Sequence, residues 1–348
     1  MTRISSALAL VLLLAARTGA AQAPPAAKPA ADSARVAELV AHARAAAGTQ
    51  WAETVDFFCG RDTARANRAD DPELTPARVF DNLYALGRTS TVIWAIKTPA
   101  GIALIDAGYP DQVESVVLPG LRKLGLDPTD VKLVLLAHGH ADHFGGAVYF
   151  QRLGARVALS AADWDLMQNP PAAPPTTAPS PAANASPSPP GSPSAALAAL
   201  PPPKRDIIVI DGQPLELGGV SFTPVAIPGH TPGSLGFVFK VVDGDRAHTA
   251  ALFGGSILLS SRIPDAGLEQ YVRSVEHFAA VTRQLGVDVE IQNHPLYDGF
   301  EAKLAQLAAR KPGAAHPFVV GTDGYQNFLT VMGDCARVEL ERRKSAAR

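Results

Sequence analysis

The chain has 348 residues, 47% of them apolar, and its 31 basic residues nearly balance its 33 acidic ones. This length and apolar content are enough for a hydrophobic core in one large or two medium domains. Binding to nucleic-acid phosphate needs clustered Lys and Arg, and the sequence has no such cluster, so we expect no nucleic-acid partner.

The N-terminus has the three parts of a secretory signal peptide. Arg3 provides a positive charge, Ala7–Ala16 is an apolar run too short to span a bilayer, and small residues follow it. We therefore predict a signal peptide over 1–23 and a periplasmic or secreted protein that leaves the membrane after cleavage. A buried N-terminal helix is the alternative, but the run has no polar residues to form a second face.

Export bears on the two cysteines, Cys59 and Cys335. Disulfides form in oxidising compartments, so the two thiols can pair after export. They can equally stay buried and unpaired, because the sequence does not give the distance between them.

Residues 24–76 predict an N-terminal extension made of one helix and a loop. Ser33–Ala47 is rich in helix-forming residues and ends at Gly48, a residue type that often terminates helices. The stretch 62–76 is charged and rich in turn residues, which indicates a loop.

From 77 to 345 short β-rich runs alternate with helical patterns, which we interpret as one domain. Runs bounded by Gly, Pro or turn residues predict strands at 79–86, 91–98, 101–108, 131–136, 206–211, 215–219, 221–227, 233–242, 248–255 and 287–291. Apolar spacing and composition predict helices at 113–124, 268–285, 299–310 and 322–343. Strands followed by helices, twice over, favour two packed sheets with helices outside.

Residues 170–203 are dominated by Pro, Ala and Ser, a composition that favours extended, solvated chain. We interpret this stretch as an exposed insertion in the domain, because candidate metal ligands lie on both sides of it. A hinge between two domains is the alternative. The segment could also act as a polyproline recognition element in a metal-binding interaction protein.

The candidate chemistry lies in three histidine clusters, each where a strand gives way to a loop. The first, His138–His143, reads HGHADH and holds four ligand-type side chains in six residues. In an extended backbone His138 and His140 point to the same side, while Asp142 and His143 turn towards a neighbouring point. One loop can therefore supply two adjacent metal centres.

The other two clusters add one histidine each. His230 lies in a loop that reads PGHTPG, and His294 follows an apolar strand in the sequence QNHP. A single histidine after a strand is more often a structural hydrogen-bonding group than a ligand. These two become informative because they complete the first cluster.

Taken in order, HGHADH, GHTPG and the later His294 resemble the motifs of the metallo-β-lactamase superfamily, over about 79–343. The resemblance implies an α/β (α+β) fold, a four-layer αββα sandwich with two zinc ions at one edge. It implies His138, His140 and His230 as ligands of the first zinc, and Asp142, His143 and His294 as ligands of the second. Asp106, in LIDAG, is similar to the family's buried aspartate that supports the metal loop. A closed structural zinc site is the alternative, but such sites favour cysteine ligands.

The implied chemistry is hydrolysis. Zinc held by three protein ligands keeps a position for water and lowers the pKa of that water to about 7. We expect zinc-bound hydroxide to attack the substrate carbonyl, with Asp142 as the catalytic residue that orients it. No serine or cysteine nucleophile is then needed.

Substrate class depends on the stretch LFGGSI at 252–257. Many superfamily members have a metal-bridging aspartate here, but this chain has Ser256, which is similar to the β-lactamase subclass with an all-His/Asp site. The resemblance implies a substrate-binding role for Ser256 and opening of the amide ring of β-lactam antibiotics. The absence of the bridging aspartate argues against glyoxalase-type thioesterases and homoserine-lactone lactonases.

One departure keeps a second substrate class open. Leu258 stands where that subclass often has a second hydroxyl residue, so hydrolysis of another cyclic ester or amide, such as a lactone, is the alternative. In either case we expect a monomer acting on a small molecule.

Overall fold

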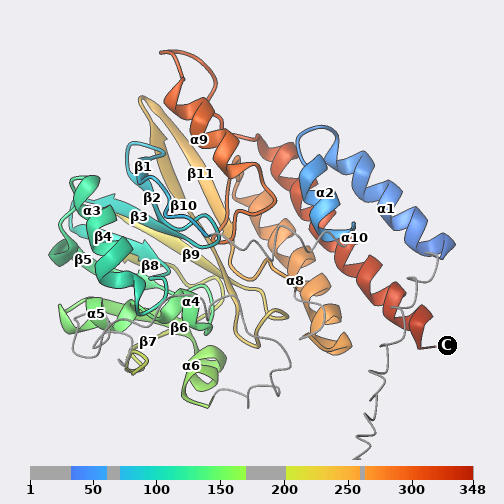
Figure 1. Ribbon diagram of the computed structural model, residues 1–348, viewed down its shortest axis with the longest axis horizontal. Helices are drawn as coiled ribbons and strands as arrows, with labels where there is room; N and C mark the ends of the chain where they lie inside the picture. The colour runs from blue at the N-terminus through green and yellow to red at the C-terminus, as the bar shows by residue number, and fades with distance from the viewer. Residues whose placement is uncertain (1–32, 61–70, 170–200, 259–262, 348) are drawn as a thin grey trace, which may run out of the picture. The chain divides into compact units, whose positions relative to one another are not determined.

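The computed structural model describes residues 33–60, 71–169, 201–258 and 263–347 (Figure 1). The predicted signal peptide and residues 170–200 of the predicted insertion lie outside the described residues. All described residues belong to one packed unit. Among them, no helix combines the length and apolar character needed to cross a membrane.

The first sheet has seven strands that follow one another in chain order. They are β1 Ala77–Arg78, β2 Leu83–Gly87, β3 Val92–Thr98, β4 Gly101–Ile105, β5 Val131–Leu135, β6 Arg156–Ser160 and β7 Ile207–Val209. The strands from β1 to β4 are antiparallel, and those from β4 to β7 are parallel. The parallel half therefore directs the C-terminal ends of its strands to one edge.

The second sheet has five strands in the order β12-β11-β10-β9-β8. They are β8 Leu215–Leu217, β9 Val220–Ala226, β10 Leu235–Asp243, β11 Arg246–Phe253 and β12 Val289–Ile291. β8 to β11 form antiparallel pairs, whereas β12 is parallel to β11.

Alternation along the strands explains why the two sheets pack face to face. In β3, Trp94 and Ile96 belong to the core between the sheets, where they meet Phe237 and Leu252 of the second sheet. The intervening Ala95 belongs to the core under the outer helices. Because both faces of the strand are buried, its sequence is an almost continuous apolar run.

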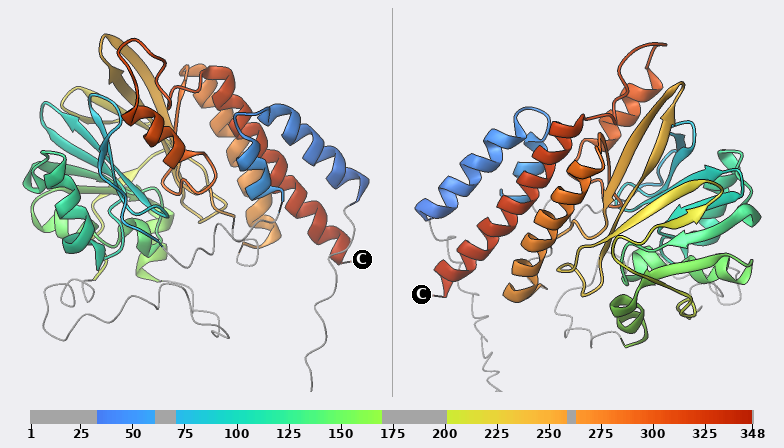
Figure 2. Two further views of the ribbon diagram at one scale, coloured as in Figure 1. Left: turned by 45° about the horizontal axis from the view of Figure 1, so that its top comes forward. Right: turned by 180° about the vertical axis from the view of Figure 1, so that it is seen from behind.

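Helices cover the outer face of each sheet (Figures 1 and 2). The first sheet is covered by a π-helical segment Val113–Val117, α3 Leu118–Lys123, α5 Ala147–Arg152 and α6 Ala161–Gln168. The second is covered by α1 Ala34–Ala47, α2 Ala52–Phe58, α8 Asp265–Gln284 and α10 Thr322–Ala346. α9 Phe300–Ala308 packs at the central core. The predicted four-layer αββα sandwich is confirmed.

Most predicted elements are present within a few residues of their expected ends. The helix expected at Ser33–Ala47 is α1, with the Ser33 hydroxyl accepting a hydrogen bond from Val36 N and Gly48 as its C-cap. The helix expected at 113–124 begins with π-helical geometry, and Pro119 follows in its next turn, where it has no N–H to donate. The patterns did not predict α2, β6 or α6, each eight residues or shorter and so too short for a clear period.

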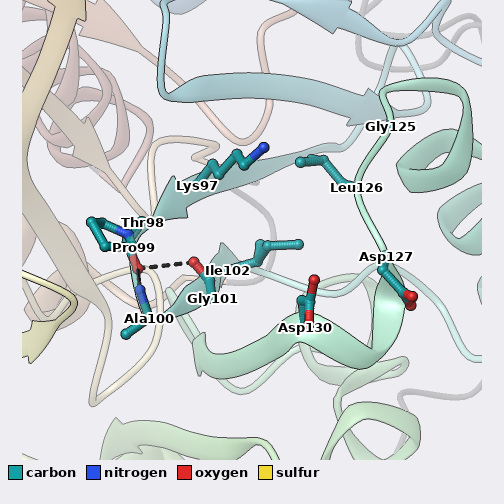
Figure 3. Close-up of a pocket in the computed structure, with 10 residues that line it drawn as sticks. All are labelled: Lys97, Thr98, Pro99, Ala100, Gly101, Ile102, Gly125, Leu126, Asp127 and Asp130. Atoms are coloured by element: carbon teal, nitrogen blue, oxygen red, sulfur yellow. Dashed lines mark hydrogen bonds between the residues drawn. The ribbon is translucent and has the colours of Figure 1, made fainter.

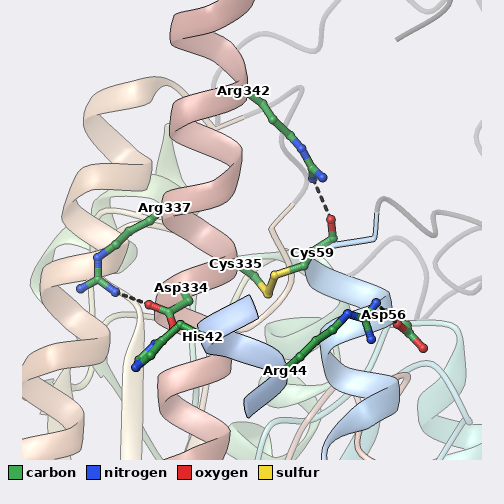
Figure 4. The surroundings of a disulfide bond; sticks show 8 residues. All are labelled: His42, Arg44, Asp56, Cys59, Asp334, Cys335, Arg337 and Arg342. Carbon is green, nitrogen blue, oxygen red and sulfur yellow. Dashed lines mark hydrogen bonds and ion pairs between the residues drawn. A yellow bond between two sulfur atoms is a disulfide. The ribbon is translucent and has the colours of Figure 1, made fainter. Parts of the chain in front are cut away.

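A disulfide joins the N-terminal helices to the last helix (Figure 4). The Sγ atoms of Cys59, which ends α2, and Cys335 in α10 are bonded, with their Cα atoms 4.8 Å apart. Arg342 Nη1 donates to the carbonyl of Cys59 at 2.7 Å. The pairing that the sequence leaves open is therefore present in the structure.

Candidate metal centre

Both sheets bring ligand-type side chains to one edge of the sandwich. β4 and β5 are parallel, so Asp106 and His138, which follow them, lie at the same edge. The rest of the HGHADH motif continues into α4, Ala141–Phe144. From the second sheet, the loop between β9 and β10 carries His230, and His294 follows β12.

The first donor group consists of His138, His140 and His230. His230 Nε2 lies 3.1 Å from His138 Nε2 and 3.1 Å from His140 Nδ1. Three imidazole nitrogens thus converge on one point, in the set that the resemblance implies for the first zinc.

The second donor group consists of Asp142, His143 and His294. Asp142 Oδ2 lies 3.2 Å from His143 Nε2 and 3.4 Å from His294 Nε2, and these two nitrogens are 3.0 Å apart. The ring centroids of His138 and His143 are only 3.9 Å apart, so the two groups are neighbours. One loop contributes to both groups, as the spacing of HGHADH predicts.

The other ring nitrogen of most of these histidines meets a fixed acceptor. The Nδ1 atoms of four histidines lie 2.7–2.8 Å from an oxygen: His138 from Gly254 O, His143 from Asp106 Oδ2, His230 from Ile257 O and His294 from Ser90 O. Because carbonyl and carboxylate oxygens only accept, Nδ1–H donates and the Nε2 lone pair faces the donor group. Imidazole and carboxylate are ligands of zinc, so both groups fit a zinc ion.

Asp106 holds the second group in place from behind. Its Oδ1 accepts a hydrogen bond from Ala137 N at 2.8 Å, and its Oδ2 accepts from Asn293 Nδ2 at 3.0 Å besides His143. Its φ of 64° is left-handed, a conformation that Asp and Asn adopt more readily than other side chains. Asp106 thus connects the end of β4 to both ligand-bearing segments of this group.

The two groups differ in their electrostatics. Burial, together with the charges of neighbouring histidines, lowers the pKa of His138 well below its usual value and that of His230 to about 3. Burial opposes the charged form of His143 as well, but Asp142 and Asp106 outweigh it and raise its pKa to about 10. Burial would raise the pKa of Asp142, yet the charge on His143 holds it below the usual range. The second group therefore combines a carboxylate with a histidine that holds an extra proton in the absence of metal, and a bound cation would displace that proton.

The sequence patterns did not identify Asp163 or Asn293 as parts of the site. The fully buried Asp163, in α6, accepts hydrogen bonds from Gly139 N and Gly233 N, each at 2.8 Å, and from the Thr231 hydroxyl. Asn293 donates to Asp106. The only local signal for Asp163 is Ser160 three residues earlier, a spacing typical of a helix N-terminus and not of a site.

Ser256 follows β11 and is fully buried next to the Tyr297 hydroxyl. The Tyr271 hydroxyl donates to its carbonyl at 3.1 Å. A substrate would contact the Ser256 hydroxyl only after its neighbours move. Its substrate-binding role stays a prediction.

A surface pocket of about 420 Å³ lies elsewhere, between the β3–β4 turn and the segment that precedes β5 (Figure 3). Gly101 begins β4 and Asp130 precedes β5, whereas the donor groups follow the other ends of these strands. One of its carboxylates, Asp127, accepts hydrogen bonds from the Thr129 backbone and hydroxyl. This pocket is therefore separate from the candidate metal centre.

Comparison with known families identifies the class of protein. The family model of the metallo-β-lactamase superfamily matches residues 85–281, which is more than half of the chain. The chain belongs to this superfamily of hydrolases.

Similar solved structures are named as metallo-β-lactamases. The subclass B3 enzyme BJP-1 of Bradyrhizobium japonicum is 24% identical and superimposes with a TM-score of 0.62, over 79% of this chain and 97% of that one. The Rm3 metallo-β-lactamase is 26% identical with a TM-score of 0.59, over 79% of this chain and 96% of that one.

The curated relatives carry a different name. Hydroxyacylglutathione hydrolase of Acidiphilium cryptum (strain JF-5) is 31% identical over 156 residues, which is 44% of this chain and 45% of that protein. The chain spans about half the length of the curated relatives that it matches. The solved structures and the curated relatives are therefore named for different activities.

Proposed function

We propose that the chain is an exported, monomeric hydrolase that binds two zinc ions and opens the amide ring of β-lactams. The observation that carries this proposal is the donor set, three histidines beside one aspartate and two histidines, with Ser256 in place of a bridging aspartate. The likeness in fold to enzymes named as subclass B3 metallo-β-lactamases supports it.

Each residue of the donor groups has a defined task in this reaction. When bound, zinc supplies a water that is deprotonated near neutral pH and a positive charge for the carbonyl oxygen of the substrate. The histidines hold the ions, and their outward N–H groups fix the rings. Asp142, the only carboxylate in either group among the described residues, orients the attacking water.

A second candidate is thioester hydrolysis, because curated relatives are named hydroxyacylglutathione hydrolases. The residue at the bridging position weighs against it, since Ser256 offers no carboxylate to share between two ions. Lactones remain the third substrate class, because Leu258 stands in place of a second hydroxyl.

The test is hydrolysis by the purified mature protein of a carbapenem, a cephalosporin, S-lactoylglutathione and an acyl-homoserine lactone. Each assay is run as purified, after chelation, and after zinc is restored. We expect kcat/KM to be highest for a β-lactam, lost on chelation and regained with zinc. Faster turnover of the thioester or the lactone would overturn the substrate proposal and leave the metal proposal standing.

Export has its own test. N-terminal sequencing of protein recovered outside the cytoplasm should show a start between residues 21 and 24. An intact Met1 on all of the protein would contradict it.

A further inference from the structure

Asp163 is a buried carboxylate that the proposed reaction does not use. It lies in α6, on the outer face of the first sheet, and is fully buried. It belongs to neither donor group. A buried carboxylate is costly unless its oxygens accept hydrogen bonds, so its partners indicate why it is there.

Its hydrogen bonds connect the two loops that carry the first donor group. Oδ2 accepts from Gly139 N at 2.8 Å and from Thr231 Oγ1 at 2.6 Å, while Oδ1 accepts from Gly233 N at 2.8 Å. Gly139 lies between two histidines of the group, and Thr231 directly follows the third. One carboxylate therefore contacts the chain next to all three ligands.

The fit around Asp163 is too close for side chains on its partners. A Cβ on Gly139 would lie 2.9 Å from the Asp163 carbonyl oxygen. A Cβ on Gly233 would lie 2.0 Å from Ser160 Oγ and 2.8 Å from Asp163 N. Glycine at both positions lets the backbone amides reach the carboxylate.

The two donor groups also differ in the carboxyls around them. Burial raises the pKa of the Asp163 carboxyl, and the two backbone N–H groups and the hydroxyl that donate to it oppose this rise. The first donor group has only imidazole ligands, whereas the second has Asp142 among its ligands and Asp106 behind it. Asp163 is thus the buried carboxyl behind the group that has no carboxyl among its ligands.

We propose that Asp163 is a positioning residue for the first metal ion. It fixes the HGHADH loop against the PGHTPG loop, and so sets the affinity of the first donor group without contacting metal or substrate. This inference rests on the part of the proposed function in which both donor groups bind zinc. It does not depend on the substrate.

The test is the variant Asp163→Asn, with Asp165→Asn as a matched control. Asp165 lies in the same helix, but it is exposed and pairs with Arg205 at 2.7 Å. Zinc affinities are measured by competition with a chromogenic chelator, and Co(II) spectra report the coordination of each group. His140→Ala and His294→Ala provide the spectra of proteins with a damaged first or second group.

We expect Asp163→Asn to weaken zinc at the first group by about 10–100-fold, the usual cost of removing a residue that orients metal ligands. The second group should keep its affinity, and the Co(II) spectrum should resemble that of His140→Ala. Asp165→Asn should match the wild type at both groups. Unchanged affinity at the first group, or equal weakening of both groups in a folded protein, would overturn the inference.

A second pair of variants covers the case in which Asp163→Asn does not fold. Thr231→Val removes the hydroxyl that donates to Asp163, and Thr231→Ser keeps it. We expect Thr231→Val to lower the zinc affinity of the first group, and Thr231→Ser to keep it close to that of the wild type. Equal affinities for the two variants would refute the role of this contact.

The outcomes separate this inference from the proposed function. A wild type that binds two zinc ions without opening β-lactams refutes the substrate proposal alone. If the wild type opens β-lactams but Asp163→Asn leaves the zinc affinity of the first group unchanged, this inference alone is refuted. A wild type that binds no zinc refutes both.

Discussion

The two donor groups lie side by side but are held in different ways. The first has three imidazoles, with His140 exposed and His230 partly exposed, and its two loops are joined through Asp163. The second has a carboxylate and the fully buried His143, and Asp106 supports it directly. The first includes an exposed ligand, His140, and consists only of imidazoles, whereas the second includes a carboxylate and its ligands are buried or partly buried.

This difference indicates which contacts set the metal affinity of each group. In the first group it should depend on Asp163, which contacts the chain beside the ligands and no ligand side chain. In the second it depends on hydrogen bonds to the ligands themselves and on the end of β12, where Asn293 O accepts from Val92 N and Gln292 O from the Trp94 indole. Variants in each region should therefore affect one ion more than the other.

Removing a ligand should have the largest effect in either group. His140→Ala and Asp142→Ala should each lower kcat/KM by about a thousandfold or more, because a bound metal contributes several kcal/mol to the transition state and each 1.4 kcal/mol is tenfold. Circular dichroism should show a folded protein, with one zinc ion lost. His277→Ala is the control, since His277 pairs with Asp211 at the surface. Full activity in either ligand variant would refute the site.

Asp106→Asn should affect the second group more than the first. Asn tolerates the left-handed backbone at this position, so the loop is kept while the charge beside His143 is lost. We expect about a 10–100-fold loss of affinity at the second group. The measurement is the same chelator competition used for Asp163→Asn. If the first group weakened instead, the assignment of one supporting carboxylate to each group would be wrong.

The sequence alone predicts the parts of the site whose residues lie close together in the chain. HGHADH places two ligand pairs on one loop, and strands followed by helices, twice over, predict two packed sheets with helices outside. Asp163 could not be found this way, because its partners lie 24, 68 and 70 residues away. Ser256 likewise lies next to Tyr297, which follows β12, the neighbour of β11 in the sheet but a strand that comes much later in the chain. Contacts made only after folding leave no periodic signal in the sequence.

A buried ion cluster next to β12 tests the comparison of the two donor groups through the stability of the protein. Lys303 Nζ lies 2.6 Å from Glu290 Oε2 and 3.4 Å from Asp298 Oδ2, and all three side chains are buried. Lys303→Met would leave two buried carboxylates without a cation, so we expect a loss of about 3–5 kcal/mol in the free energy of unfolding. Because Glu290 lies on β12, any accompanying loss of zinc should be at the second group.

Urea unfolding with and without zinc measures this effect. Lys344→Met is the control, because Lys344 pairs with Glu341 at the surface and should contribute less than about 1 kcal/mol. Equal stability of the two variants would contradict a structural role for the cluster.

The disulfide should have the smallest effect on the site. Cys59 and Cys335 are 276 residues apart and join α2 to α10, in the helical layer behind the second sheet. Cys59→Ser with Cys335→Ser should lower the free energy of unfolding by about 2–5 kcal/mol. Zinc content and kcat/KM at 25 °C should match the wild type, because neither donor group contacts this layer through the cysteines. If the double variant lost one ion selectively, the helical layer would have to be counted among the supports of that donor group.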